Sequence, residues 1–334
     1  MTTIKHIIEV EHLIKKFGDL VAVDDISFHV EEGEIFGFLG PNGAGKTTTI
    51  NILCTLMKPT AGEVSVNGFN VKRQPDQVRR SIGLVFQEPS LDIRLTALHN
   101  LNFHAHVYGV PRSVRKARIE EVLNMVELWD RRKDDVKDYS GGMRRRLEIA
   151  RGLLHYPKVL FLDEPTLGLD PQTRSRIWEY IVDLKRRENI TIFLTTHYMN
   201  EADIANRIAV IDSGKIVALD SPADLKKTVG GDIITLSTND NEAAKAEIRR
   251  QFAIEAKEDN EGITFEVQNG EEFIPNLVRS LETKILRIGA RRPTLDDVFL
   301  KITGREIRDE AGGEAALRRQ WTMRQAGSRG GRFH

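Results

Sequence analysis

The sequence predicts an α/β protein with a mainly parallel sheet, followed by a small α+β unit of ferredoxin-like type. Two patterns in the first part of the 334-residue chain support the parallel sheet. Short apolar runs recur there, and each is typical of a buried central strand. Segments with helical periodicity separate these runs, and strands that alternate with helices favour a parallel sheet with helices on its faces.

The elements of the predicted sheet follow one another in a simple order. Residues 6–14 and 21–30 are predicted strands because their apolar residues alternate. The apolar run from Ile35 to Leu39 predicts a central strand that enters a glycine-rich loop and then a helix from Thr47 to about Met57. Beyond it we expect strands over Ile82–Phe86, Val159–Leu162, Thr191–Thr195 and Ile208–Ile211, and helices over 112–127, 141–155 and 171–188.

The pattern changes near Ser221-Pro222, which divides residues 6–221 from a second unit over residues 222–304. After a short helix, the second unit is predicted to contain strand, helix, strand, strand, helix and strand over 232–238, 241–252, 254–258, 263–267, 271–282 and 284–290. This order is typical of the split βαβ, ferredoxin-like fold.

Two features close the chain. Thr294 and Asp297 predict a capping box for a helix that ends at Thr303. Its apolar face must be buried against its own unit, the first unit or a second copy of the chain, and consists of Leu295, Val298, Phe299 and Ile302. Residues 305–334 lose periodicity and become basic, so we expect a disordered tail.

The composition argues against several classes of protein. Lys+Arg and Asp+Glu each number 49, so no specific nucleic-acid binding is expected. The single cysteine, Cys54, cannot form an internal disulfide, which favours a reducing, cytosolic compartment. The N-terminus is polar, without a signal peptide, and no apolar run approaches the roughly 20 residues that span a bilayer. If the protein drives transport, another chain must supply the membrane path.

A phosphate-binding loop is the strongest motif. The pattern G-x-x-x-x-G-K-[ST] is matched in full by Gly40, Pro41, Asn42, Gly43, Ala44, Gly45, Lys46 and Thr47. Glycines let the backbone N–H groups face the phosphates, and the helix N-terminus adds positive charge. Lys46 would reach the β- and γ-phosphates, and the Thr47 hydroxyl would bind Mg²⁺. The strand before the loop and the helix after it argue against a purely structural turn.

Two carboxylates follow a second buried strand. Asp163 and Glu164 leave the carboxyl end of Val159–Leu162, where open α/β sheets bind ligands. Asp163 is placed for Mg²⁺ through water, and Glu164 is placed to orient and polarise an attacking water. A pair of solvated carboxylates is the alternative, and the neighbouring phosphate loop argues against it.

Three further segments narrow the class of phosphate-loop protein to which this sequence could belong. Ser140-Gly141-Gly142 opens a helix and predicts a second anion-binding site. Thr195-Thr196-His197 ends the strand after the one that carries Asp163. Gln87 follows Ile82–Phe86, between the phosphate loop and Ser140.

In this order the segments resemble the nucleotide-binding domain of ATP-binding-cassette transporters over about residues 6–221. The matches are Gly40–Thr48 to Walker A, Gln87 to the Q-loop, Tyr139–Met143 to the signature, Leu160–Glu164 to Walker B, Gly168–Asp170 to the D-loop and His197 to the switch histidine. The resemblance implies a P-loop ATPase fold with a helical subdomain and an antiparallel β subdomain. It also implies ATP and Mg²⁺ as cofactors.

The resemblance implies a role for each matched residue. Catalysis would depend on Glu164, His197 and Gln87, and the Mg²⁺ ion would be held by Thr47, Gln87 and Asp163. Besides the phosphate loop, the nucleotide would contact Phe17, Thr48, Ser140, Gly141, Gly142 and Asp170.

The resemblance also implies a head-to-tail homodimer, in which Ser140-Gly141-Gly142 of one subunit would close on ATP held by the other. Tyr139 and Met143 depart from the usual Leu and Gln of the signature, but the Ser-Gly-Gly is intact, so we expect activity. Phe17 would stack on adenine, with a core phenylalanine as the alternative.

Three segments resemble the daunorubicin-resistance subfamily of exporter ATPases more narrowly: Thr195–Ala202, Tyr139–Met143 and Pro293–Leu300. This likeness implies an ATPase subunit that powers drug or antibiotic efflux with a separate transmembrane permease subunit, at the cytoplasmic face of the cell membrane. Related subunits export sodium, lipids or polysaccharides, so the cargo stays open.

Two other classes are weighed against the exporter. A soluble cassette protein acting on ribosomes or DNA usually has a second cassette or a long coiled-coil insertion, and neither is present in this sequence. A non-hydrolysing regulator is disfavoured because Asp163, Glu164 and His197 are all intact. Arg144-Arg145-Arg146 is interpreted as a solvated helix face, with contact to the membrane partner as the alternative.

Overall fold

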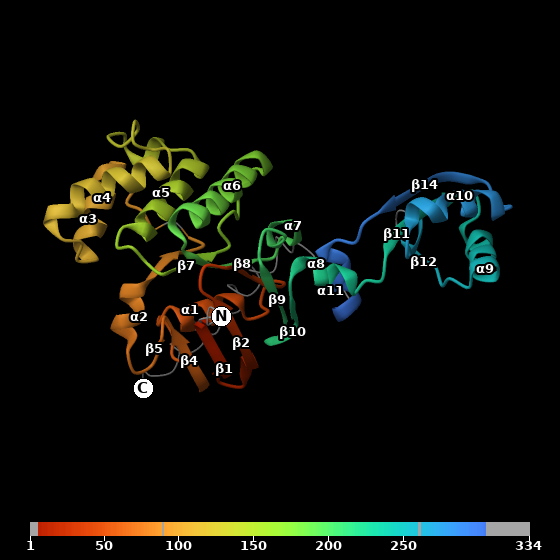
Figure 1. Cartoon of the computed structure of the whole chain (residues 1–334), viewed down its shortest axis with the longest axis horizontal. Helices are drawn as coiled ribbons and strands as arrows, with labels where there is room; N and C mark the ends of the chain where they lie inside the picture. Colours follow the sequence, from red (N-terminus) through yellow and green to blue (C-terminus); the bar gives the residue numbers. More distant parts are fainter. Residues whose placement is uncertain (1–5, 89, 260–261, 305–334) are drawn as a thin grey trace, which may run out of the picture.

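The computed structural model describes residues 6–88, 90–259 and 262–304, so the predicted tail over 305–334 lies outside the described residues. The described chain has a large lobe that contains β1 to β10 and a smaller lobe built around β11 and β14 (Figure 1). Helices α8 (Pro222–Lys227) and α11 (Leu295–Thr303) lie between the lobes. Within the described residues, no helix is both long and apolar enough to cross a membrane.

The central sheet of the large lobe has the order β10-β9-β3-β8-β7-β6. Neighbours from β9 to β6 are parallel, and β10 is antiparallel to β9. The prediction of a mainly parallel sheet is therefore confirmed, although it did not include β10. The strands are β3 Ile35–Leu39, β6 Ile82–Val85, β7 Val159–Asp163, β8 Thr191–Thr196, β9 Arg207–Asp212 and β10 Lys215–Asp220.

Alternate residues of a strand point to opposite faces of the sheet, and both faces are buried along the central strand β3. Ile35 and Leu39 of β3 join a core with residues of α5 and α6. Phe36 and Phe38 join a second core with residues of α1 and of the other sheet. The helices are α1 Lys46–Leu53, α5 Gly141–Leu153, α6 Pro171–Glu188 and the short α7 Met199–Ala202.

A second, antiparallel sheet has the order β2-β1-β4-β5, which confirms the antiparallel β subdomain. It packs on the central sheet through aromatic contacts, and the Phe28 and Phe36 ring centroids are 5.5 Å apart. The strands are β1 His6–Phe17, β2 Leu20–Glu31, β4 Ala61–Val66 and β5 Phe69–Asn70, followed by helix α2 Pro75–Ser81. β1 and β2 are longer than predicted because they pair up to a tight turn after Phe17.

Helices α3 (Ala97–Val107) and α4 (Arg112–Met125) form the helical subdomain with α5. A short 3-10 helix over Val136–Asp138 leads the chain from this subdomain into α5. Leu101 and Ile119 are buried in the core that α5 shares with the central sheet, so the helical subdomain rests directly on α5.

The smaller lobe contains β11 Asp232–Thr238, α9 Asn241–Phe252, β12 Lys257–Asp259, β13 Gly262–Val267, α10 Gly270–Ser280 and β14 Ile285–Arg291. Its sheet has the order β12-β13-β11-β14 with antiparallel neighbours, which is the arrangement of a split βαβ fold. The ferredoxin-like prediction is confirmed. The lobe has a hydrophobic core of its own that includes Leu236, Ile248 and Phe265.

Helix α11 does not belong to the core of the smaller lobe. Thr294 and Asp297 form the predicted capping box, and Leu295, Val298 and Phe299 are buried in the core of the large lobe. The helix packs against α8 and α7. Of the three surfaces that could have covered the predicted apolar face, the large lobe covers these three residues, while Ile302 is 38% exposed.

Candidate nucleotide-binding site

The phosphate loop lies between β3 and α1 and is shaped by two glycines with neighbours too close for a side chain. A Cβ atom at Gly40 would lie 2.2 Å from the Ile211 carbonyl oxygen. At Gly45, where φ is 107°, it would lie 2.6 Å from the Ala22 carbonyl oxygen. Gly45 caps α1 without a side-chain hydrogen bond, so the first amides of α1 have no side-chain cap. Such amides and the helix dipole suit an anion.

Lys46 lies under this loop and is 4% exposed. Its Nζ donates hydrogen bonds to the carbonyl oxygens of Gly40 at 2.8 Å and Pro41 at 3.1 Å. The same atom lies 3.3 Å from Oε1 of Glu164. Burial lowers the pKa of Lys46, while the negative charge of Glu164 acts in the opposite direction.

Asp163 ends β7 and faces the first residues of α1. Its Oδ1 accepts hydrogen bonds from the Thr195 hydroxyl at 2.5 Å and the Thr47 hydroxyl at 3.5 Å. Burial raises the pKa of Asp163, and the Thr195 hydrogen bond partly offsets this. A carboxylate and a hydroxyl oxygen are hard ligands of the kind that Mg²⁺ prefers, so Asp163 and Thr47 fit this ion.

Glu164 follows Asp163 in a left-handed conformation, with φ 45°. Its carboxylate lies between two cationic or polar groups, 3.3 Å from Lys46 Nζ and 3.2 Å from His197 Nδ1. Burial favours a higher pKa for Glu164, but the hydrogen bond with His197 and the charge of Lys46 outweigh it, so the pKa is lowered. The structure thus brings Lys46, Glu164 and His197 into one buried cluster.

The Ser140-Gly141-Gly142 segment begins α5 beside the start of α6. The Ser140 hydroxyl caps α5 by accepting from the Met143 amide at 3.2 Å. A Cβ atom at Gly142 would lie 2.5 Å from Cγ2 of Thr173, so glycine permits close packing on α6. Asp170 is exposed and caps α6 by accepting from the Thr173 amide at 3.0 Å. Hydrogen bonds from the side chain and the amide of Thr173 lower the pKa of Asp170.

The other predicted nucleotide residues lie at loop or strand ends. Gln87 is half-buried two residues beyond Val85, the end of β6. Phe17 ends β1 and is 45% exposed, with Lys15 Nζ 4.9 Å from its ring centroid. The alternative interpretation of Phe17 as a core residue is therefore wrong. Thr48 is half-buried in the first turn of α1, while Asn42 and Gly43 are exposed in the loop.

The structure adds residues that the sequence reasoning missed. Arg145 is buried and its guanidinium lies behind the site, so the interpretation of Arg144–Arg146 as a solvated face is wrong for the middle arginine. Glu201 is also buried and accepts hydrogen bonds from the hydroxyls of Thr166 and Thr196, next to the carboxyl ends of β7 and β8. No local pattern in the sequence separates Arg145 from Arg144 and Arg146, so only the structure reveals its burial.

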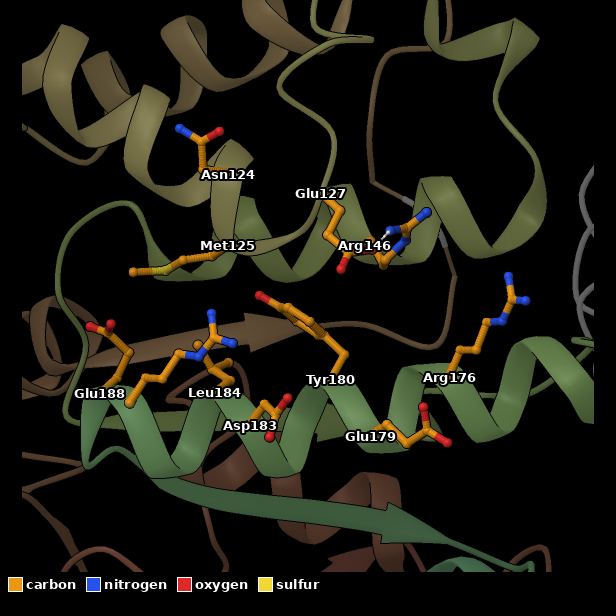
Figure 2. Close-up of a pocket in the computed structure, with 11 residues that line it drawn as sticks. Asn124, Met125, Glu127, Arg146, Arg176, Glu179, Tyr180, Asp183, Leu184 and Glu188 are labelled. Carbon is orange, nitrogen blue, oxygen red and sulfur yellow. Dashed lines mark hydrogen bonds and ion pairs between the residues drawn. The ribbon is translucent and has the colours of Figure 1, made fainter.

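A cavity of about 430 Å³ lies away from these residues (Figure 2). It is bounded by the end of α4, by Arg146 of α5 and by α6 from Arg176 to Glu188. Tyr180 points from α6 toward Met125. None of the predicted nucleotide contacts lines this cavity.

Comparison with known proteins defines the class. Residues 23–167 match the family described as ABC transporter, and residues 221–303 match the ATP-binding protein DrrA1-3-like, C-terminal domain. The chain belongs to the ABC transporter family, and it is an ATP-binding subunit with ATPase activity.

The particular relatives are resistance and export proteins. The chain is 39% identical to the daunorubicin resistance ATP-binding protein DrrA2 of Streptomyces coeruleorubidus over 92% of its length and 98% of that protein. It is 36% identical to the linearmycin resistance ATP-binding protein LnrL of Bacillus subtilis over 90% of its length and 100% of that protein. The Nod factor export ATP-binding protein I of Cupriavidus pinatubonensis is 36% identical over 91% of this chain and 92% of that protein.

Solved structures agree with the cassette fold. The cbiO1 protein of Clostridium perfringens, part of an ABC transporter complex, has a TM-score of 0.63 and 28% identity, covering 67% of this chain and 93% of that one. A dimeric ATP-binding cassette bound to ADP and Pi in a post-hydrolysis state has a TM-score of 0.58 and 30% identity, covering 64% and 98%.

Proposed function

We propose that this chain is the motor of an exporter whose transmembrane path is a separate permease subunit, and that the exporter expels drugs or antibiotics. The observation that carries the proposal is the match over residues 221–303, outside the ATPase core, to the C-terminal domain of DrrA-like proteins. The chain would act at the cytoplasmic face of the cell membrane, held there by the permease. Similarity to a Nod factor exporter favours a second candidate, an exporter motor for a different cargo such as a lipid, polysaccharide or sodium.

In the proposed catalytic cycle, the ATP phosphates enter the phosphate loop and compete for Lys46, which turns from the Gly40 and Pro41 carbonyl oxygens and Glu164 toward the β- and γ-phosphates. Glu164 is then free to orient and polarise the attacking water, and its lowered pKa keeps it ionised. His197 contacts the γ-phosphate.

Thr47 and Asp163, with Gln87, would hold Mg²⁺, which neutralises phosphate charge when bound. The oxygen groups of Thr47 and Asp163 already face one another, which supports this assignment. Adenine would stack on Phe17, whose ring is accessible at the end of β1.

We also propose a head-to-tail homodimer. Within the described chain, Ser140-Gly141-Gly142 and Asp170 contact α5 and α6 and have no hydrogen bond to the phosphate loop. A second copy can therefore supply them to ATP. A solved relative that is dimeric with ADP and Pi supports this arrangement.

The proposed division of labour follows the two units. Residues 6–221 would be the ATP-binding cassette and residues 222–304 an accessory unit for assembly. The family matches over residues 23–167 and 221–303 support this division. Within the second unit, the smaller lobe has a separate core, whereas α8 and α11 pack in the core of the large lobe.

The test is reconstitution. The tagged chain should purify in detergent with a multi-spanning membrane protein, and vesicles containing both should accumulate daunorubicin only with hydrolysable ATP. If the complex hydrolyses ATP but does not move daunorubicin, the motor proposal stands and the cargo is wrong. If the chain purifies with ribosomes or DNA and with no membrane protein, the exporter proposal is wrong.

A further inference from the structure

Helix α5 carries three buried charged residues behind the nucleotide site. Arg145, Glu148 and Arg151 are 8%, 1% and 5% exposed, and their spacing of three places them along one side of the helix. The helix begins at Ser140, so the same rigid element carries the proposed phosphate contact and these three charges.

Arg145 joins the ends of two neighbouring strands. Its guanidinium donates to the carbonyl oxygen of Phe86 at 2.6 Å, next to Gln87. It also donates to the carbonyl oxygens of Asp163 and Glu164, both at 3.2 Å, and of Pro165 at 2.5 Å. Since Glu164 has positive φ, these contacts lie at the turn that aims its carboxylate.

Glu148 holds the far end of the Gln87 segment. Its Oε1 accepts from the Ser90 amide at 2.6 Å and the Leu91 amide at 3.2 Å. Arg151 donates to Oε2 of Glu148 at 3.0 Å and to the Leu84 carbonyl oxygen at 2.9 Å, within β6. The chain from Leu84 to Leu91 is therefore attached to α5 on both sides of Gln87.

Fold stability alone is a poor explanation for these residues. Burying a charge is costly, and apolar side chains of similar volume often stabilise a core as well or better. Burial lowers the pKa of Arg145 to about 10, so the side chain is still charged at neutral pH. The guanidinium instead fixes the relative position of two strand ends, because its planar fork can donate to carbonyl oxygens on both strands at once.

We infer that Arg145 and Glu148 are positioning residues for ATP hydrolysis, which hold Gln87 and Glu164 in register with the Ser140 end of α5. The inference rests on the roles proposed for Gln87 and Glu164. Neither positioning residue needs to touch the nucleotide. Each acts through the backbone of the segment that carries a proposed catalytic residue.

The neighbouring Arg146 provides a matched control. Its side chain leaves the same helix in another direction, donates to the Val126 carbonyl oxygen at 3.0 Å and lines the cavity beside α6 (Figure 2). Arg146→Gln removes the same charge as Arg145→Gln and leaves the contacts to β6 and β7 intact.

The experiment measures kcat for MgATP hydrolysis and the affinity for a non-hydrolysable ATP analogue in the full chain. Arg145→Gln should lower kcat between about 10- and 100-fold, as small misplacements of catalytic groups do, with affinity within about twofold of the parent. Arg145→Lys keeps the charge but cannot bridge both strands, so kcat should still fall at least about fivefold. Glu148→Ala should behave like Arg145→Gln, and Arg146→Gln should resemble the parent.

Glu164→Gln in the same assay distinguishes failure of the positioning inference from failure of the proposed role of Glu164. If Glu164→Gln hydrolyses ATP at the parental rate, the proposed role of Glu164 is wrong. If Glu164→Gln is inactive while both Arg145 variants stay within about twofold of the parental kcat, the positioning inference alone is wrong. An equal loss of affinity and kcat, or failure of both Arg145 variants to fold, would show a general structural role and would also overturn it.

Discussion

Glu164 occupies a left-handed backbone conformation that non-glycine residues rarely adopt, with φ 45°. Its amide donates to the Thr195 carbonyl and hydroxyl oxygens at 3.2 and 3.1 Å, which hold the turn in place. Such conformations cost roughly 1–3 kcal/mol and gather at functional sites. Here the turn brings the carboxylate to both Lys46 and His197.

Removing the charge of Lys46 should disable the phosphate site. Lys46→Ala is expected to weaken ATP binding and lower turnover at least about 100-fold, because a preorganised cationic contact to the phosphates is lost. The measurement is ATP affinity and steady-state turnover. The exposed Lys116→Ala is the matched control and should resemble the parent. Unchanged affinity and turnover in Lys46→Ala would refute the phosphate-loop assignment.

Replacing Glu164 with Gln should separate binding from hydrolysis. The amide keeps the side-chain shape but cannot polarise water, while Asp163 is untouched, so we expect ATP binding with turnover reduced by roughly 100- to 1,000-fold. The trapped species should be a dimer on gel filtration with ATP. A monomer that still hydrolyses ATP would contradict both the role of Glu164 and the proposed dimer.

His197 is held in the site by its contact with Glu164 and by ring packing on Tyr198, with centroids 4.1 Å apart. His197→Ala should therefore slow hydrolysis by at least about 100-fold and leave ATP affinity near the parental value. Single-turnover kinetics and equilibrium binding measure the two effects separately. Hydrolysis at the parental rate would reduce His197 to a structural residue.

At the scale of single elements, the sequence of α11 predicts its apolar face but not the surface that buries this face. Its capping box and its apolar face are readable from sequence, but both the large lobe and its own unit offered apolar surface. In the structure α11 packs against α8 and α7, and Phe299 is 1% exposed in the core of the large lobe.

Two neighbouring residues of α11 make this testable. Phe299→Ala should reduce the free energy of unfolding by about 3–5 kcal/mol, because a buried aromatic leaves a cavity. Leu300→Ala is the control, since Leu300 is 40% exposed, and should cost under about 1 kcal/mol. Denaturant unfolding measures both. Equal, small losses would mean that α11 is not part of the core.

At the scale of the whole molecule, the smaller lobe has its own core while the helices on either side of it belong to the large lobe. One core contains central-sheet residues together with Leu225 of α8, Val229 just after α8, and Leu295 and Phe299 of α11. The smaller lobe is therefore an insertion between two helices of the large lobe rather than a unit appended after Asp220.

Two shortened chains test whether the smaller lobe is an insertion between α8 and α11 or a unit appended after Asp220. Replacing residues 232–291 by a flexible Gly-Ser linker should preserve folding and ATP affinity within about twofold, because α8 and α11 stay in place, while weakening dimer or permease assembly. Ending the chain at Asp220 should lower the melting temperature or cause aggregation, because apolar core surface is exposed. If the chain ending at Asp220 is as stable as the parent, the structural role of α11 is wrong.

Sequence alone was sufficient wherever the determinant is local. The phosphate loop, the Asp163-Glu164 strand end and the capping box at Thr294 are short contiguous patterns whose backbone geometry follows from glycine, helix dipole and strand alternation. The order of strands and helices likewise predicts both folds. The sequence analysis did not predict edge strands such as β5 and β10, because they are short or carry polar residues that a central strand would exclude.

Tertiary structure alone decided which distant segments meet. In the sequence, Arg145 is the middle of three arginines, and nothing local separates it from Arg144 or Arg146. Its direction depends on how α5 lies across β6 and β7, which brings the carbonyl oxygens of residues 86 and 163–165 within hydrogen-bond distance. The burial of α11 depends in the same way on a surface assembled from several segments. Local patterns determine elements because their causes lie within a few residues, whereas these contacts arise only when the sheet and helices have packed.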